Sequence, residues 1–195
     1  MYLAKYPRTP HLPFSQKPGR DDLVLKDLGH FSGKRLVITE KMDGENITSY
    51  KDAWHIRSLS SKTREHHWYF LTHILPNIQS KIDDDMRICG EYMFHEHAIR
   101  YDNLPSYYLV HSIWRENTCL DWDETKRICD ELGLDTVPEL AIISVDNKQV
   151  WDFVRGVATG VCSRGGEGIV VRNASSFTYE NFSKNVAKYV GKGEI

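Results

Sequence analysis

Short apolar segments of strand length recur along the whole chain, and this pattern limits the fold more than any other feature. The first of them reads RLVIT, a run rich in the β-branched residues that strands favour. Segments of this kind lie at 35–39, 46–50, 54–59, 86–94, 107–114, 137–144, 168–172 and 186–190. Because helices do not alternate strictly with these strands, we expect an α+β fold with mainly antiparallel sheets and flanking helices.

Helical patterns occupy less of the chain. Helices are expected at 66–82, broken near Pro76, at 121–132 and at 147–158. The clearest begins at Asp121, with Glu124 three residues later as in a capping box, and Gly133 follows as a C-terminal stop. The Asp43-Gly44 pair predicts a tight turn between the first two strands.

Composition indicates an ordered chain without a strong charge bias. With 41% hydrophobic residues the chain can bury a core, and its formal charge of -2 does not predict a nucleic-acid partner. Residues 1–22, rich in Pro, Lys and Arg, are expected to form an extended arm before a single domain at 23–195. We find no signal-peptide pattern and no apolar run of membrane-span length, so we expect a cytoplasmic protein without a membrane partner.

Residues 40–46, EKMDGEN, hold the most informative motif. Lys41 stands at the end of an apolar strand, just before the Asp43-Gly44 turn. A lysine becomes a nucleophile when burial or a neighbouring cation lowers the pKa of its amine. The K-x-D-G motif alone is weak evidence for such a role, because Asp-Gly is also a common hairpin turn.

Three further motifs follow in order: GEY at 90–92, EGIVVR at 167–172 and KNVAKYV at 184–190. Together with K-x-D-G-x-N they resemble the covalent nucleotidyltransferase superfamily of RNA ligases, DNA ligases and mRNA-capping enzymes. The resemblance implies a ligase adenylation domain, also described as ATP-grasp-like. The T-E-K-x-D-G-x-N form and the arm sequence at 5–13 are similar to ATP-dependent RNA ligases, especially a small phage and bacterial group.

The resemblance implies the following catalytic roles. Lys41 would attack the α-phosphate of ATP and carry AMP as a phosphoramide. Glu91 would touch the ribose hydroxyl, Glu167 would bind a catalytic Mg²⁺ or Mn²⁺, and both carboxylates are candidate metal ligands. Lys188 is the best match for the phosphate-binding lysine of the last motif. Lys184 and Lys192 remain alternatives, because the family usually shows two lysines one residue apart.

The resemblance also implies further nucleotide contacts. Glu40 would lie beside the adenine, while Asp43 and Asn46 would orient the lysine, the phosphates or the RNA end. Arg57 matches a position that holds nucleotide or RNA phosphate, with a solvated strand arginine as the alternative. His111 replaces an aromatic residue, often Phe, that stacks on the purine, with a core-edge histidine as the alternative.

The expected activity is ATP-dependent RNA ligation, in which AMP passes from Lys41 to an RNA 5′-phosphate and a 3′-hydroxyl then displaces it, as in RNA repair. DNA ligases and capping enzymes usually add an oligonucleotide-binding barrel, and only seven residues follow Lys188, so we expect no such barrel. A minimal DNA ligase, a capping-type enzyme and a non-catalytic nucleic-acid-binding relative are the alternatives. Retention of Lys41, Glu91 and Glu167 argues against the last of these.

Two groups of neighbouring histidines are interpreted as structural and not as metal sites. His66 and His67 are expected on a solvated helix face. The run His95-Glu96-His97 lacks the spacing of a zinc-protease motif, so no zinc site is expected there.

Overall fold

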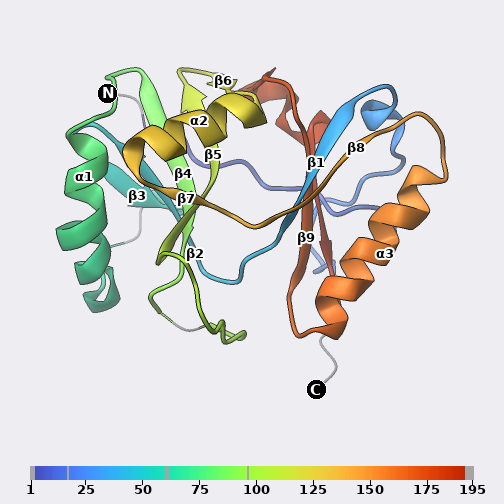
Figure 1. The fold of residues 1–195 in the computed structure, drawn as a ribbon, viewed down its shortest axis with the longest axis horizontal. Helices are drawn as coiled ribbons and strands as arrows, with labels where there is room; N and C mark the ends of the chain where they lie inside the picture. The colour runs from blue at the N-terminus through green and yellow to red at the C-terminus, as the bar shows by residue number, and fades with distance from the viewer. Residues whose placement is uncertain (1–2, 17, 60–61, 96, 192–195) are drawn as a thin grey trace. The chain divides into compact units, whose positions relative to one another are not determined.

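The computed structural model describes residues 3–16, 18–59, 62–95 and 97–191 (Figure 1). Its chain divides into two compact units. Unit 1 comprises Met1–Tyr6 and Asp43–Val137, and unit 2 comprises Pro7–Met42 and Pro138–Ile195. One division therefore falls inside the lysine motif, between Met42 and Asp43.

Unit 2 is built on a four-stranded antiparallel sheet. In spatial order its strands are β11 (Val186–Val190), β9 (Gly168–Asn173), β1 (Arg35–Glu40) and β8 (Glu139–Ser144). The long helix α3 (Val150–Ser163) packs on one face, where Val154 and Ala158 join a core with Ile38 and Ile169 (Figure 1). Alternation along the strand then puts Thr39 and Lys41 toward the opposite face. Shorter elements of this unit are η1 (Gly29–Phe31), β10 (Phe177–Thr178) and η4 (Tyr179–Lys184).

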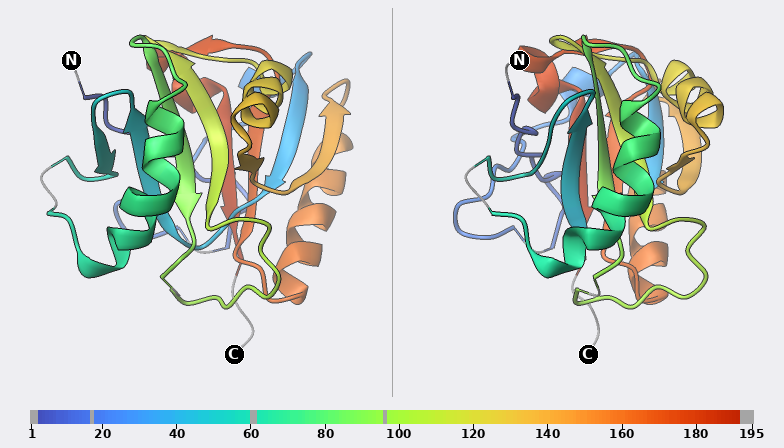
Figure 2. Two further views of the ribbon diagram at one scale, coloured as in Figure 1. Left: turned by 60° about the vertical axis from the view of Figure 1, so that its left-hand side comes forward. Right: turned by 90° about the vertical axis from the view of Figure 1, so that its left-hand side faces the viewer.

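Unit 1 contains a second, larger antiparallel sheet. Its strands run in the order β6 (Thr118–Cys119), β5 (Tyr108–Arg115), β4 (Met86–Tyr92), β2 (Glu45–Tyr50) and β3 (Trp54–Ile56), and β7 (Asp135–Thr136) pairs in parallel with β5. Its helical segments are η2 (Glu65–His67), the π-helical η3 (Phe70–Ile74), α1 (Leu75–Gln79) and α2 (Trp122–Leu132). Helices α1 and α2 cover the face that carries Ile47, Ile88 and Val110 (Figure 2). Asn46 and Glu91 therefore belong to the opposite face.

The expected mixture of helices and antiparallel sheets is confirmed, and so are the signals at the ends of α2. The side chain of Asp121 accepts a hydrogen bond from the N–H of Glu124 at 2.8 Å. Gly133 ends the helix in the left-handed conformation, with φ of 67°. None of the helices in the described ranges is long and apolar enough to cross a membrane.

Three local expectations differ from the structure. Asp43-Gly44 is not a hairpin turn, because β1 and β2 belong to different sheets and do not pair. Pro76 lies in the first turn of α1, directly after the π-helical η3 ends at Ile74, so the helical stretch changes geometry near Pro76 but does not stop there. The predicted helix at 147–158 starts later and runs further, as Val150–Ser163.

The boundary predicted between an arm and a domain after residue 22 stays a prediction. Residues 7–22 belong to unit 2, where the N–H of Leu12 donates to the carbonyl of Lys188 at 2.8 Å. This part of the predicted arm is therefore attached to the edge strand β11.

Candidate active site

Lys41 is held beside a carboxylate at the end of β1. Its Nζ lies 2.5 Å from Oε2 of Glu167, and the two side chains are 23% and 22% exposed. The backbone N–H of Lys41 donates to the carbonyl of Gly168 at 2.9 Å, so the start of β9 positions the lysine and the adjacent carboxylate together. The structure thus joins the predicted nucleophile to a group that can accept a hydrogen bond from its amine.

Gly168 lets the strands approach closely next to this pair. Its φ is 154°, and a Cβ atom here would lie 2.0 Å from the carbonyl oxygen of Tyr189 in β11. No side chain fits at that distance. Gly168 of the EGIVVR motif therefore has a structural role: it allows β11, which carries Lys188, to lie close to Glu167.

Lys188 is the lysine of the last motif that lies nearer to Lys41. Val170 of β9 pairs with Lys188 on one side and with Thr39 on the other, so Lys188 is in register with a residue two positions before Lys41. By contrast, Lys184 is exposed, and its carbonyl accepts a hydrogen bond at 3.3 Å from Lys34, just before the start of β1. The register favours Lys188 over Lys184, and Lys192 lies outside the described residues.

His11 is a buried polar residue beside Lys188 that sequence reasoning missed. It is bridged to Lys188 in β11, and its ring nitrogens contact Ser15 Oγ at 2.8 Å and Asp22 Oδ2 at 3.2 Å. Burial lowers the pKa of His11, the positive charge of Lys188 lowers it further, and Asp22 opposes both. The only sequence signal was a histidine within a proline-rich arm.

Glu40 lies on the α3 side of the sheet. Burial raises the pKa of its carboxyl group, while the charge of Arg164 opposes the shift. Its backbone N–H already donates to the carbonyl of Pro138 at 2.9 Å. A role beside the adenine would therefore not involve this N–H.

In unit 1, the structure brings together Asn46, Glu91 and His111. Asn46 pairs directly with Glu91 across β2 and β4. The β4–β5 register shifts so that Gly90 faces Val110 and Cys89 faces Ser112, which leaves His111 as an extra bulge residue. The bulge places His111 Nε2 2.8 Å from Nδ2 of Asn46.

Further contacts show how these groups are held. The N–H of Gly44 donates to Glu91 Oε1 at 3.2 Å, and a Cβ atom at Gly44 would lie 2.6 Å from the carbonyl oxygen of Tyr92. The ring of His111 meets that of Tyr6 edge-on, with centroids 4.8 Å apart. Oδ1 of Asn46 is buried and has no hydrogen-bond partner among the described residues, so it can accept a hydrogen bond from a ligand.

Asp43 and Arg57 have different surroundings. Asp43 Oδ2 accepts hydrogen bonds from the backbone N–H groups of Ala98 and Ile99 at 2.9 and 3.1 Å. Its own N–H donates to the hydroxyl of Tyr101 at 3.0 Å. Asp43 therefore anchors the 98–101 loop. Arg57 is exposed and follows the last residue of β3.

Residues 34–190 match the RNA ligase family in sequence. The chain belongs to the RNA ligase family. No curated protein sequence matches it.

Solved structures show the same fold. An archaeal ATP-dependent RNA ligase superposes with a TM-score of 0.65 at 15% identity, over 97% of this chain and 48% of that one. A putative ATP-dependent DNA ligase from Aquifex aeolicus gives 0.66 and 18%, over 97% and 50%. A variant of the Naegleria gruberi RNA ligase with ATP and Mn gives 0.59 and 12%, over 98% and 61%. This member of the RNA ligase family spans about half the length of the first two, and the predicted ligase-type fold is confirmed.

The expectation of a solvated His66-His67 pair is wrong in this RNA ligase fold. His67 is fully buried, and the Nε2 atoms of His67 and His66 lie 2.6 and 3.1 Å from Oε2 of Glu45. Burial acts to raise the pKa of Glu45, but the hydrogen bonds from His67 and His66 outweigh it and lower the pKa. No pattern in the sequence indicates this contact, because it joins residues more than twenty positions apart.

Glu45, His66 and His67 have the residue types of a metal site, but their hydrogen bonds argue against one. The N–H of Arg64 donates to Nδ1 of His67 at 2.9 Å, so the proton of a neutral His67 is assigned to Nε2. A metal bound at Nε2 would need that nitrogen deprotonated. The cluster therefore fits a hydrogen-bonded clamp between β2 and η2 better than a metal site, and Glu96 of the neighbouring run lies outside the described residues.

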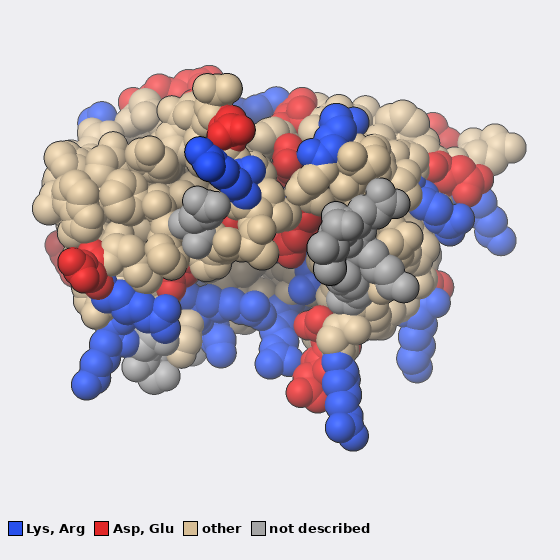
Figure 3. Space-filling model, turned by 90° about the horizontal axis from the view of Figure 1, so that it is seen from below, with Lys and Arg blue, Asp and Glu red and all other residues tan. Residues whose placement is uncertain are grey.

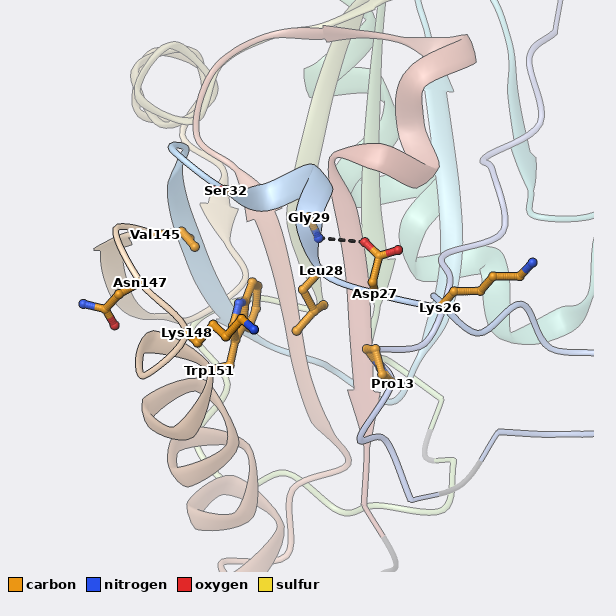
Figure 4. Close-up of a pocket in the computed structure, with 10 residues that line it drawn as sticks. All are labelled: Pro13, Lys26, Asp27, Leu28, Gly29, Ser32, Val145, Asn147, Lys148 and Trp151. Atoms are coloured by element: carbon orange, nitrogen blue, oxygen red, sulfur yellow. Dashed lines mark hydrogen bonds between the residues drawn. The ribbon is translucent and has the colours of Figure 1, made fainter.

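Unit 2 also contains a largely apolar pocket of about 570 Å³ near the start of β1 (Figure 4). Trp151 of α3 forms one wall, and Lys26 and Lys148 are among the lining residues. Asp27 at its edge accepts a hydrogen bond from the N–H of Gly29 at 2.8 Å. None of these residues belongs to a recognisable sequence motif, because segments far apart in the chain form the pocket.

Proposed function

We propose that this chain is an ATP-dependent RNA ligase that carries AMP on Lys41 and joins an RNA 5′-phosphate to a 3′-hydroxyl. The observation that carries the proposal is the contact between Lys41 and Glu167, in a chain of the RNA ligase family. The register of Lys188 supports it, because a second cation close to the lysine suits a transferring phosphate.

In the first step, the neutral amine of Lys41 attacks the α-phosphorus of ATP. A phosphorus–nitrogen bond forms and the bond to pyrophosphate breaks. The nitrogen, which carries a positive charge after the attack, then loses a proton. Glu167 orients the amine through its hydrogen bond, and Lys188 balances negative charge on the phosphate.

In the second and third steps, the acceptor changes. An oxygen of the RNA 5′-phosphate attacks the same phosphorus, the bond to Lys41 breaks and the lysine regains a proton. The 3′-hydroxyl then attacks the activated 5′-phosphate, loses its proton and displaces AMP. Each step is a phosphoryl or nucleotidyl transfer, in which the protein mainly positions groups and neutralises charge.

A divalent cation fits the donor chemistry of the residues present. Mg²⁺ and Mn²⁺ prefer oxygen ligands, and Glu167 and Glu91 each offer a carboxylate in its motif. When bound, such a cation would neutralise charge on the ATP phosphates. The N. gruberi RNA ligase with ATP and Mn supports the same class of cofactor for this chain.

The unit 1 residues would bind the nucleoside and the RNA end. Glu91 would contact the ribose hydroxyl, His111 would lie against the purine, and the buried Oδ1 of Asn46 would accept a hydrogen bond from the ligand. Exposed Arg57 would contact phosphate. Glu40 would lie beside the adenine through its backbone or its side chain, whose carboxyl pKa is raised by burial.

Transfer of label from ATP to the denatured protein tests the first step. The wild-type chain with Mg²⁺ or Mn²⁺ should become labelled from α-labelled ATP, and Lys41→Ala should not, whereas Lys184→Ala should label normally. Absence of label on the wild type with either metal would refute adenylation, and label on Lys41→Ala would refute the site. Stronger labelling from GTP would favour a capping-type enzyme instead.

A sealing assay tests the acceptor. RNA ends should be joined, while faster joining of a nicked DNA duplex would favour the minimal DNA ligase. The likeness to the putative Aquifex DNA ligase is the observation that keeps this second candidate in view.

A further inference from the structure

Unit 1 exposes a group of interlocked aromatic rings. Trp68 and Tyr107 are 49% and 43% exposed, although large apolar side chains are usually more buried. Both contact Phe94 edge-on, at centroid distances of 5.6 and 5.2 Å. We call Trp68, Phe94 and Tyr107 the aromatic shelf.

A second layer of rings supports the shelf. The ring of Tyr69 stacks on Phe94 at 5.0 Å with an interplanar angle of 9°, and it also meets Tyr107 edge-on at 5.3 Å. Behind it, Phe94 stacks at 6.1 Å on Tyr92, a fully buried residue of β4. The exposed rings are therefore held in place by the sheet, which makes them a preformed surface.

The shelf is continuous with a polar pocket that is tied to the lysine motif. A pocket of about 250 Å³ is lined by Phe94 and Tyr107 together with Asp43, Tyr101 and Arg100. Asp43 is two residues from Lys41 in the chain and anchors the pocket loop through the N–H groups of residues 98 and 99. A ligand on the shelf would thus lie next to a residue of the nucleophile motif.

Exposed cations lie near the shelf residues in the chain and could contact phosphates of a bound strand. Lys62 and Arg64 are exposed and precede Trp68 by six and four residues. Arg100 is largely exposed and lies 3.6 Å from the equally exposed Asp102, so its guanidinium can reorient toward a phosphate at little cost. Figure 3 shows projecting Lys and Arg side chains among scattered Asp and Glu, so the net charge of -2 does not describe every part of the surface.

We propose that the aromatic shelf stacks unpaired bases of the RNA strand that is being joined. This inference rests on the proposed function and deepens it by naming the substrate class. Aromatic rings bind bases of single strands or loops, whereas bases inside a duplex are stacked on one another and are not available. The enzyme would therefore act on unpaired RNA ends in preference to a nicked duplex.

The test is RNA affinity measured without ATP, for a single strand and for a nicked duplex of the same sequence. Trp68→Ala and Tyr107→Ala should each weaken single-strand binding about tenfold and leave duplex binding unchanged. Trp68→Phe should keep most of the affinity. Phe153→Ala is the matched control, because Phe153 is 50% exposed on α3 of the other unit, and it should have no effect.

The possible outcomes separate this inference from the proposed function. Each shelf variant should still label Lys41 from ATP at the wild-type rate, which also shows that it is folded. Wild-type protein that binds single strands through the shelf but never becomes labelled would refute the ligase mechanism alone. Shelf variants that bind single-stranded RNA as the wild type does would overturn the inference and assign the shelf to another partner, such as a protein. Equal losses for single strand and duplex would also overturn it.

Discussion

Asn46 and His111 are joined by a hydrogen bond of 2.8 Å that spans the intervening strand β4. A phenylalanine at 111 could stack on a purine but could not make this bond. The bond fixes the amide of Asn46 and leaves its Oδ1 as the buried acceptor without a partner among the described residues. His111, which is predicted to lie against the purine, is therefore bonded to Asn46, which is predicted to orient the phosphates or the RNA end.

This link predicts different effects for two substitutions. His111→Ala should raise the ATP concentration needed for half-maximal labelling about tenfold, because it removes both the ring and the bond. His111→Phe should recover most of that loss and retain a defect of about 1 kcal/mol from the missing hydrogen bond. The measurement is the rate of lysyl-AMP formation against ATP concentration.

A double variant checks whether the bond is responsible. His111→Phe combined with Asn46→Ala should be no worse than Asn46→Ala alone, since the pair acts together. Strictly additive losses would show that His111 contributes without Asn46.

Two glycines provide a matched test of stability. Gly168→Ala should destabilise the fold by about 3 kcal/mol or more, because the new Cβ atom would clash with the backbone of Tyr189. Gly156→Ala in α3 meets nothing within 4 Å and should stabilise the protein by about 1 kcal/mol, through the helix preference for alanine. Urea unfolding measures both, and a Gly168→Ala protein as stable as the wild type would contradict the close approach of β9 and β11.

Local signals predicted local structure well, and long-range pairings could not be predicted. Asp121 and Gly133 mark the ends of α2 because capping depends on neighbouring residues. The assignment of β1 and β2 to different sheets depends on partners that are up to about a hundred residues away, such as β8. The bulge at His111 arises from one extra residue in a strand pairing, which periodicity does not reveal.

Residue types were likewise predicted more readily than their partners. The motif order identified Lys41 and Glu167 through family resemblance, and the structure shows that they touch. Nothing in the sequence paired Glu45 with His67, because two ordinary polar residues carry no sign of their contact.

The buried histidines predict how stability depends on pH. Burial is the largest cause that lowers the pKa values of both His11 and His55 from their usual 6.5. As pH falls below 6.5, the unfolded chain takes up protons that the folded chain resists, so the free energy of unfolding should fall. The stability contributed by these groups is thus complete above pH 6.5 and is lost toward their folded-state pKa values.

Urea unfolding at pH 7.0 and pH 5.5 measures this effect. His11→Gln and His55→Gln should each reduce the difference in unfolding free energy between the two pH values, since a glutamine does not titrate. A wild-type protein that is equally stable at both pH values would contradict the burial of the two histidines.

The register of β11 predicts which lysine of the last motif takes part in AMP transfer. Lys188 is in register with Thr39 through Val170, whereas Lys184 lies beside Lys34 before the start of β1. Lys188→Ala should slow lysyl-AMP formation roughly a hundredfold, the usual effect of removing one group that stabilises transition-state charge. Lys184→Ala should change the rate by less than about twofold, because solvent and salt screen the charge of an exposed and distant lysine. Because both variants remove one positive charge, their comparison cancels any effect of net charge. A larger loss in Lys184→Ala would show that the sheet register does not locate the phosphate.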